Sequence, residues 1–210
     1  MPYDHEEQEQ LAALRAWWAD NSKFIAGTLA AVALAATGWF GWRAWQAQQA
    51  QAAGAYYETL LRAAQAGDAK ALRDAAGALA EGYGGTLYAS MGALSAAKFL
   101  FDKGDLKGAR AQLQWVIERS ASGELRDIAR LRLAAVLLDE KSYDEALKLL
   151  EAKHAAAFEA QYAALKGDLL VAKGQDTEAK AAYRQALEKA ADGGGPFRAS
   201  VQMRLDALGG

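Results

Sequence analysis

The chain contains no cysteine, only two prolines and only two histidines among its 210 residues. Without cysteine it can form no disulfide bond and offers no thiol for redox or nucleophilic chemistry. A site built on paired histidines would have to join His5 and His154, which lie on either side of a long apolar segment. Because the prolines stand at positions 2 and 196, residues 3–195 contain no such helix breaker, and the abundance of Ala, Leu, Glu, Lys, Arg and Gln favours helix throughout.

Neither sign of charge dominates the chain, which has 24 basic and 26 acidic residues. Two of the basic and five of the acidic residues precede Phe24, so the long remainder has 22 and 21 and is close to neutral. A nucleic-acid-binding surface needs an excess of basic residues, so we expect no nucleic-acid partner. The sequence has no phosphate-cradling glycine loop, and the glycines at 193–195 are interpreted as a flexible joint. We therefore predict a protein that is not an enzyme and has no catalytic residues, cofactor or metal site.

An uncharged segment extends from Phe24 to Trp42, between Lys23 and Arg43. These nineteen residues, as a helix, rise roughly 28 Å, about the thickness of the hydrocarbon core of a bilayer. The six strongly apolar residues contribute a modest roughly −2 to −4 kcal/mol to insertion. The alternatives are a buried helix of a globular domain, which normally shows a polar face, and a cleavable signal peptide, which begins with positive charge. We predict a retained transmembrane helix in contact with membrane lipid.

Aromatic and basic residues flank the apolar segment. Tryptophans stand on both sides, as in the interfacial belts of membrane proteins, at Trp17, Trp18, Trp39, Trp42 and Trp45. The first two are predicted to lie on an amphipathic pre-helix that rests at the headgroups. Arg15 and Lys23 precede the segment and Arg43 follows it, so the positive-inside rule favours a cytoplasmic N-terminus.

Small residues share one face of the apolar segment, at Gly27, Ala31, Ala35 and Gly38. Small residues at this spacing let another transmembrane helix approach closely, which makes this face a candidate contact surface. The alternative is that an alanine-rich segment simply places small residues on every side.

The residues after the apolar segment repeat every 30–40 positions, which predicts a helical solenoid. The clearest unit resembles the tetratricopeptide repeat, with Gly167 as the small residue in the middle of the first helix and Gly174 at the turn. Corresponding small residues of the second helices lie 37 and 33 residues apart, at Ala109, Ala146 and Ala179. They are small because the two helices of a repeat cross closely. An earlier, degenerate pair surrounds residues 56–61 and 69–81.

Turn and cap residues support this register. Lys141 replaces the turn glycine of the middle repeat. Side chains predicted to cap the second helices of their pairs are Asp68, Asp105 and Asp176, and Ser142 with Glu145 matches a capping box. After the glycines at 193–195, Pro196 begins a last helix with an apolar stripe at Phe197, Val201, Leu205 and Leu208, which predicts a capping helix.

The first helices of the repeats are predicted to line a mostly apolar partner-binding groove. Its candidate residues are Met91, Leu94, Lys98, Phe101, Ile128, Leu131, Leu138 and Val171. Such a surface suits an extended apolar segment or a helix of a partner. The alternative is that the capping helix or the helix around Tyr56–Arg62 fills the groove, in which case these residues are core.

The sequence thus predicts an all-α chain: a single N-terminal transmembrane helix followed by a tetratricopeptide-like helical solenoid with a C-terminal capping helix. The predicted parts are an acidic arm with an amphipathic pre-helix (1–23), a transmembrane helix (24–42), a linker helix (43–54) and a tetratricopeptide-like domain (55–210).

Three motifs resemble one known family. They are Trp17-Trp18-x-x-Asn21-x-Lys23 before the apolar segment, Gly41-Trp42-Arg43-x-Trp45 at its end, and the C-terminal residues 201–208. With the acidic arm and the repeats, they resemble the YfgM family of ancillary subunits of the bacterial SecYEG translocon. Ser22 stands where that family usually has glycine.

The resemblance implies a single-pass protein of the bacterial inner membrane, with a cytoplasmic N-terminus and a periplasmic repeat domain. It implies association with SecYEG and with the membrane-anchored periplasmic chaperone PpiD, assistance to newly translocated client proteins, and a role for the arm in regulating envelope-stress signalling. No catalytic residues come with the family. The alternative is a periplasmic scaffold of another cell-envelope complex that shares only the fold.

Overall fold

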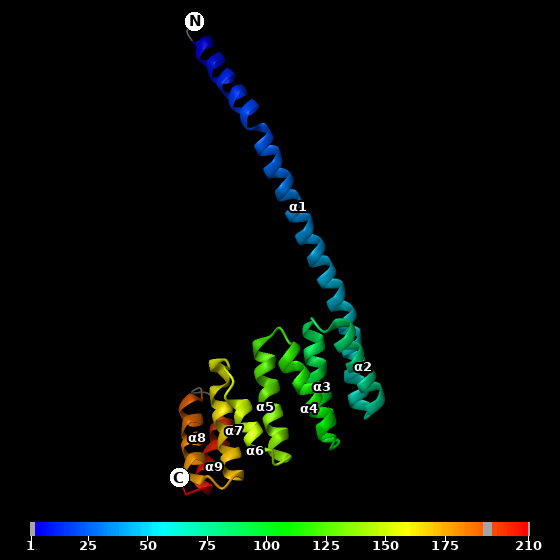
Figure 1. Ribbon diagram of the computed structural model, residues 1–210, viewed down its shortest axis with the longest axis vertical. Helices are drawn as coiled ribbons and strands as arrows, with labels where there is room; N and C mark the ends of the chain where they lie inside the picture. Colours follow the sequence, from blue (N-terminus) through cyan, green and yellow to red (C-terminus); the bar gives the residue numbers. More distant parts are fainter. Residues whose placement is uncertain (1–2, 191–194, 210) are drawn as a thin grey trace. The chain divides into compact units, whose positions relative to one another are not determined.

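A computed structural model describes residues 3–190 and 195–209, with side chains from residue 7 onward, and all regular elements in these ranges are helical (Figure 1). In chain order they are α1 (Tyr3–Ala66), α2 (Ala69–Tyr83), α3 (Leu87–Asp102), α4 (Leu106–Arg119), α5 (Gly123–Asp139), α6 (Tyr143–Leu150), the short 3₁₀ helix η1 (Ala156–Phe158), α7 (Glu159–Ala172), α8 (Asp176–Lys189) and α9 (Gly195–Ala207). This architecture confirms the predicted fold class.

The chain forms two compact units, residues 1–48 and residues 49–210. Helix α1 contributes to both, so residues 3–23 of the predicted arm, the apolar segment and the linker all lie within one helix. Ala53, which the sequence assigns to the linker, is fully buried among side chains of α2 and α3.

The first unit is the part of α1 that carries the apolar segment. Among the described residues, α1 is the one helix long and apolar enough to cross a membrane, and none of its most apolar stretch is buried against protein. The hydroxyls of Thr28 and Thr37 donate hydrogen bonds to the carbonyls of Phe24 and Ala33, at 2.9 and 2.8 Å. The helix therefore satisfies its own hydroxyl groups in this stretch, as a hydrocarbon environment requires.

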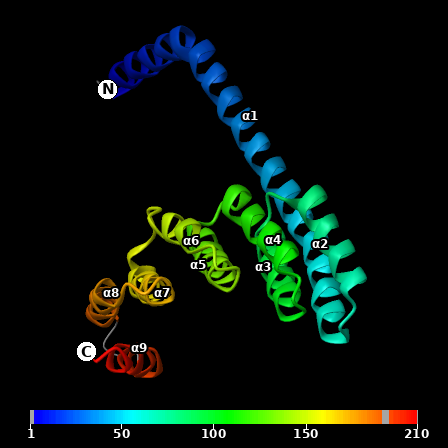
Figure 2. The ribbon, with the colours of Figure 1, turned by 60° about the horizontal axis from the view of Figure 1, so that its bottom comes forward.

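The second unit consists of antiparallel helix pairs packed side by side (Figure 2). The end of α1 pairs with α2, and the later pairs are α3 with α4, α5 with α6, and α7 with α8. The alanines predicted at the crossings, Ala109, Ala146 and Ala179, are fully buried. In the last pair, a Cβ added to Gly167 would lie 2.4 Å from the ring of Tyr183. The predicted reason for small residues, close helix crossing, is confirmed.

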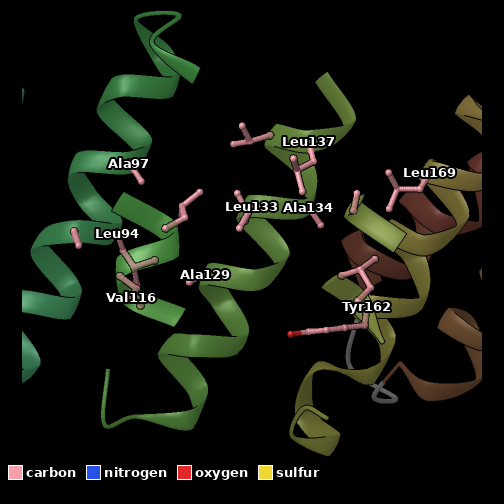
Figure 3. Close-up of a cluster of buried hydrophobic side chains, with 14 residues drawn as sticks. Leu94, Ala97, Val116, Ala129, Leu133, Ala134, Leu137, Tyr162 and Leu169 are labelled. Carbon is pink, nitrogen blue, oxygen red and sulfur yellow. The ribbon is translucent and has the colours of Figure 1, made fainter. Parts of the chain in front are cut away.

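A central core joins neighbouring pairs. Figure 3 shows Leu94 of α3, Leu133 and Leu137 of α5 and Leu169 of α7 among its side chains, with Val116 contributed by α4. Each of these five residues is less than one-tenth exposed. Because each pair buries its apolar face against the next, the array needs its neighbours to be stable.

The turns within the pairs share a left-handed residue. Gly67, Gly104 and Gly174 have φ of 73°, 78° and 75°, and Lys141 takes the same place with φ of 60°. The prediction that Lys141 replaces the turn glycine is confirmed. Lysine has a Cβ, so it adopts this conformation at a steric cost that glycine avoids.

The predicted caps are only partly correct. Asp68 accepts hydrogen bonds from the N–H groups of Lys70 and Ala71, and Asp105 accepts one from Gly108. Asp176 is not a cap residue, because α8 already begins at Asp176 and the N-cap position is occupied by Gln175.

The predicted capping box at Ser142 is also wrong. Ser142 is the N-cap residue of α6, but its side chain makes no capping hydrogen bond. The Glu145 carboxylate forms an ion pair with Arg110 of the preceding repeat instead. A tertiary partner therefore replaces the local one.

The predicted capping helix is present as α9. Val201 and Leu205 are buried, and Phe197 and Leu208 pack on the same cluster with side chains of α7 and α8. The stripe read from the sequence is thus the face by which α9 closes the array. Residues 193 and 194 of the predicted glycine joint lie outside the described residues.

Candidate functional site

A cavity of about 270 Å³ opens between α3 and α5, on the side of the array that the first helices form. Its walls are Ala97, Lys98, Phe101 and Asp102 from α3 and Arg132, Ala135 and Val136 from α5, with Leu113 of α4 at its base. The cavity is mostly apolar and carries charge at its edge. We call it the α3–α5 groove.

The structure places the eight predicted groove residues in four environments. Lys98 and Phe101 are exposed and line the α3–α5 groove. Leu94 is only 6% exposed and belongs to the central core. The others are the half-buried Met91, Ile128, Leu131 and Leu138, the last three packed against the central core, and the exposed Val171 at the end of α7.

Sequence periodicity identified the right helices but missed all three of the groove's lining residues on α5, which are Arg132, Ala135 and Val136. Arg132 and Ala135 both line the cavity. On the helix wheel Ala135 lies about 40° and Arg132 about 100° from the predicted Leu131. Offsets of this size do not exceed the width of an amphipathic face, so periodicity does not distinguish these positions.

Charge at the groove edge is partly compensated. Lys98 forms an exposed ion pair with Asp102, at 2.7 Å. The Arg132 guanidinium donates a hydrogen bond to the Leu94 carbonyl, at 3.2 Å, and forms no ion pair with any carboxylate of the described chain. The edge therefore offers a cation beside an apolar floor.

Neither segment that could have filled the groove lies there. Helix α9 packs on α7 and α8. The Tyr56–Arg62 part of α1 packs on the opposite side of α3: a Cβ added to Gly92 would lie 3.5 Å from Leu60. Gly92 and Phe101 are nine residues apart, which on a helix is half a rotation. Within the described residues, the groove is open.

A buried carboxylate that the sequence analysis did not identify lies between α5 and α7. Asp127 is 3% exposed and accepts hydrogen bonds from Arg130 (2.7 Å) and from the Ala155 N–H (3.0 Å), while the Tyr162 hydroxyl lies at 3.5 Å. His154 stacks on Tyr162 with ring centroids 3.8 Å apart. These contacts fasten the connection between α6 and α7 onto α5. The only sequence signal was an acid three residues before an arginine, which is common on solvated helices.

Two buried tyrosines have hydroxyl groups whose pKa is raised above the ordinary value for tyrosine. Burial, followed by the negative charge of Asp127, raises the pKa of Tyr162 to about 12. Burial and the hydrogen bond that Tyr183 donates to Asp168 raise the pKa of Tyr183. Both groups are structural, because their hydroxyls are engaged with neighbouring carboxylates rather than aimed into the groove.

The Asp168 carboxylate connects three helices. It accepts hydrogen bonds from Tyr183 of α8 at 2.8 Å and from Arg204 of α9 at 3.0 and 2.8 Å. The structure gives this carboxylate a role in holding α9 on the array. In the described part of the chain, no cluster of His, Asp and Glu is placed to hold a metal ion.

The candidate helix-contact face is solvent-exposed along its whole length. Gly27, Ala31, Ala35 and Gly38 are all exposed, and nothing in the described chain lies within 4 Å of a Cβ added to either glycine.

Residues 15–210 match the family described as tetratricopeptide repeat-like domain. The chain is 34% identical to the ancillary SecYEG translocon subunit of Haemophilus influenzae over 90% of this chain and 92% of that protein. It is 33% identical to the protein of the same name from Aggregatibacter actinomycetemcomitans, over 99% and 100%. The protein of that name from Escherichia coli is 29% identical, over 87% of each.

Among solved structures, the chain resembles MamA, residues 41 to the end, from Desulfovibrio magneticus RS-1. The TM-score is 0.54 at 24% identity, and the likeness covers 74% of this chain and 82% of that one. This likeness supports the repeat fold alone.

Proposed function

The chain belongs to the family of ancillary SecYEG translocon subunits, and from this premise we propose that α1 anchors it in the bacterial inner membrane beside the SecYEG translocon. Membership in this non-enzymatic family confirms the prediction that the chain is not an enzyme. The observation that carries the proposal is the extent of the match, which includes the apolar segment of α1 as well as the repeats.

The proposed topology has the N-terminus in the cytoplasm and the repeats in the periplasm. The basic residues Arg15 and Lys23 before the apolar segment, against Arg43 after it, support this orientation. Single cysteines placed at Ala16 and at Ala181, in a chain that otherwise has none, test it in intact cells. A membrane-impermeant maleimide should modify the second position and not the first. Modification of the first position alone would contradict this topology and place the N-terminus in the periplasm.

The α3–α5 groove is the proposed contact surface for a PpiD-like periplasmic chaperone or for newly translocated clients. Its support is the apolar floor with Phe101 and Ala135 and the cationic edge at Arg132, all of which the described chain leaves uncovered. Tethering by α1 would hold this surface at high effective concentration near emerging chains, so weak contacts suffice.

Site-specific photocrosslinking in intact membranes tests the partners. A photoreactive residue at Phe101 should capture a PpiD-like chaperone or a translocating client, and one at Gly38 should capture a SecYEG subunit. The matched control is Met203, an apolar residue that is 71% exposed on α9. Equal capture from Phe101 and Met203 would contradict the proposal that the groove is the contact surface. Capture of no translocon component from any position would contradict the proposed association with the translocon.

A substitution pair separates a binding surface from core. Phe101→Glu places a charge on the groove floor, and Met203→Glu places the same charge on the exposed face of α9. We expect both variants to keep the helical circular dichroism and the melting temperature of the parent, and only Phe101→Glu to lose the crosslinked partner. A melting temperature that falls for Phe101→Glu alone would assign this residue to the core. Leu94 does not serve for this test, because its burial makes unfolding the expected result.

A periplasmic scaffold of another cell-envelope complex, which would share only the repeat fold, is the competing proposal. Purification of the full-length protein in mild detergent distinguishes the two. Translocon subunits should dominate the co-purified proteins under the first proposal and be minor under the second.

A further inference from the structure

The N-terminal part of α1 carries large apolar side chains on one side that the described chain leaves uncovered. They are Leu11, Leu14, Trp17 and Trp18, each between 54% and 61% exposed. At 100° per residue they span about 120° of the helix circumference. Glu9, Ala16 and Asp20 lie on the other side of the helix. This one-sided pattern is an amphipathic face, which we call the Leu11–Trp18 face.

A helix that continued straight out of the membrane would have no use for such a face. Leu11 precedes the first residue of the apolar segment by thirteen positions, which is roughly 20 Å of helix, well beyond the hydrocarbon core. At that height water surrounds all sides of the helix equally. Only a helix that lies along the surface distinguishes its two sides.

Between the face and the apolar segment, two polar side chains bond back to carbonyls of the preceding turn. The Asn21 side chain donates a hydrogen bond to the Trp17 carbonyl at 2.8 Å, and the Ser22 hydroxyl bonds the Ala19 carbonyl at 3.4 Å. Side chains that bond back to the preceding turn bend helices. Figure 2 shows α1 changing direction within its blue N-terminal part.

We propose that the segment containing the Leu11–Trp18 face lies in the membrane interface, with that face in contact with lipid, and that the change of direction in the N-terminal part of α1 joins it to the membrane-crossing segment. The lipid is favoured over a protein occupant because only residues 19–23 separate the face from the apolar segment, which keeps the face close to the membrane surface when that segment crosses. The contact is apolar rather than electrostatic, since residues 7–23 carry three acidic and two basic side chains. This inference rests on the proposed membrane insertion of α1.

Single cysteines in the full-length protein test it, because the parent chain contains no cysteine. Leu14→Cys lies on the face, Ala16→Cys lies about 160° away around the helix at nearly the same height, and Val32→Cys lies inside the apolar segment. Each variant is labelled with a polarity-sensitive fluorophore and reconstituted into phosphatidylcholine vesicles. We expect blue-shifted and severalfold brighter emission at positions 14 and 32, with emission typical of water at position 16.

The outcomes separate the inference from the proposed function. Emission typical of water at both positions 14 and 16, with position 32 protected, overturns the inference and leaves membrane insertion intact. Emission typical of water at position 32 overturns insertion and the inference together. Protection at position 14 that disappears when lipid is added in excess at constant protein would identify a second copy as the occupant and overturn the lipid contact.

Discussion

At the scale of single residues, Gly167 shows how one missing methyl group sets a helix crossing. Its place on α7 lies directly beneath the Tyr183 ring of α8, where an added Cβ would approach to 2.4 Å. Real structures do not hold atoms so close, so a side chain here must move the helices apart.

Gly167→Ala is therefore expected to destabilise the repeat domain by about 1–3 kcal/mol, the usual cost of overpacking. The measurement is the thermal unfolding midpoint of the full-length protein in detergent micelles. Gly77→Ala is the matched control, because Gly77 lies in the interior of α2 with nothing within 4 Å of an added Cβ. The control is expected to be neutral or more stable, since alanine favours helix over glycine by about 1 kcal/mol. Equal effects of the two changes would contradict the crossing argument.

Lys141 offers a change in the opposite direction. Its φ of 60° places a lysine where the equivalent turns use glycine. Lys141→Gly should raise the unfolding midpoint, because relief of the left-handed strain, about 1–2 kcal/mol, exceeds the added freedom of the unfolded chain, about 0.5–1 kcal/mol. Lys103→Gly, at a turn residue with φ of −90°, has no strain to relieve and should lower the midpoint. A lower midpoint for Lys141→Gly would mean that contacts of the lysine side chain stabilise the fold by more than the left-handed backbone conformation costs.

At the scale of elements, the cap is held by one carboxylate as well as by its apolar stripe. Asp168 receives hydrogen bonds from both α8 and α9, and charge-assisted bonds of this kind are the stronger ones. Helices at the end of an array have one neighbour instead of two, so local opening there depends on few contacts.

Asp168→Asn should accelerate amide hydrogen exchange in α9 by roughly tenfold, corresponding to about 1.5 kcal/mol for a hydrogen bond to a charged group. Exchange in α3 should be unchanged. Asp206→Asn is the control, because in the described part of the chain the Asp206 carboxylate accepts a hydrogen bond from Gln202 of the same helix and from no other helix. Faster exchange throughout the domain would show that the array opens as a unit rather than from its end.

At the scale of the whole molecule, the repeat domain contains two tyrosines whose side chains are buried, Tyr162 and Tyr183. The raised pKa of Tyr162, about 12, and of Tyr183 makes folding stability depend on pH in the alkaline range. In the unfolded chain tyrosine ionises near pH 10, so above that pH the unfolded state binds fewer protons than the folded state. Stability is then fully present below about pH 10 and falls as pH rises toward 12.

Urea midpoints of the parent and of Tyr162→Phe at increasing pH should therefore differ in slope. Phenylalanine cannot ionise, so the variant loses less stability between pH 10 and 12 than the parent. The comparison removes the contribution of lysines, which titrate in both proteins. Parallel pH profiles would show that the Tyr162 hydroxyl is not protected by the fold.

The sequence by itself determined what depends on composition and period: the helical class, the apolar segment, the small residues at the crossings, the turn position of Lys141 and the stripe of α9. These features are local, or repeat at a spacing that one chain displays. Tertiary structure alone decided which side chains of α3 and α5 face the groove, because a rotation of one residue separates a core position from a lining one. It also decided that Glu145 pairs with Arg110 rather than capping its own helix, and that Asp127 is buried. Those outcomes depend on partners about 30 residues away, and a linear pattern carries no record of which distant groups will meet.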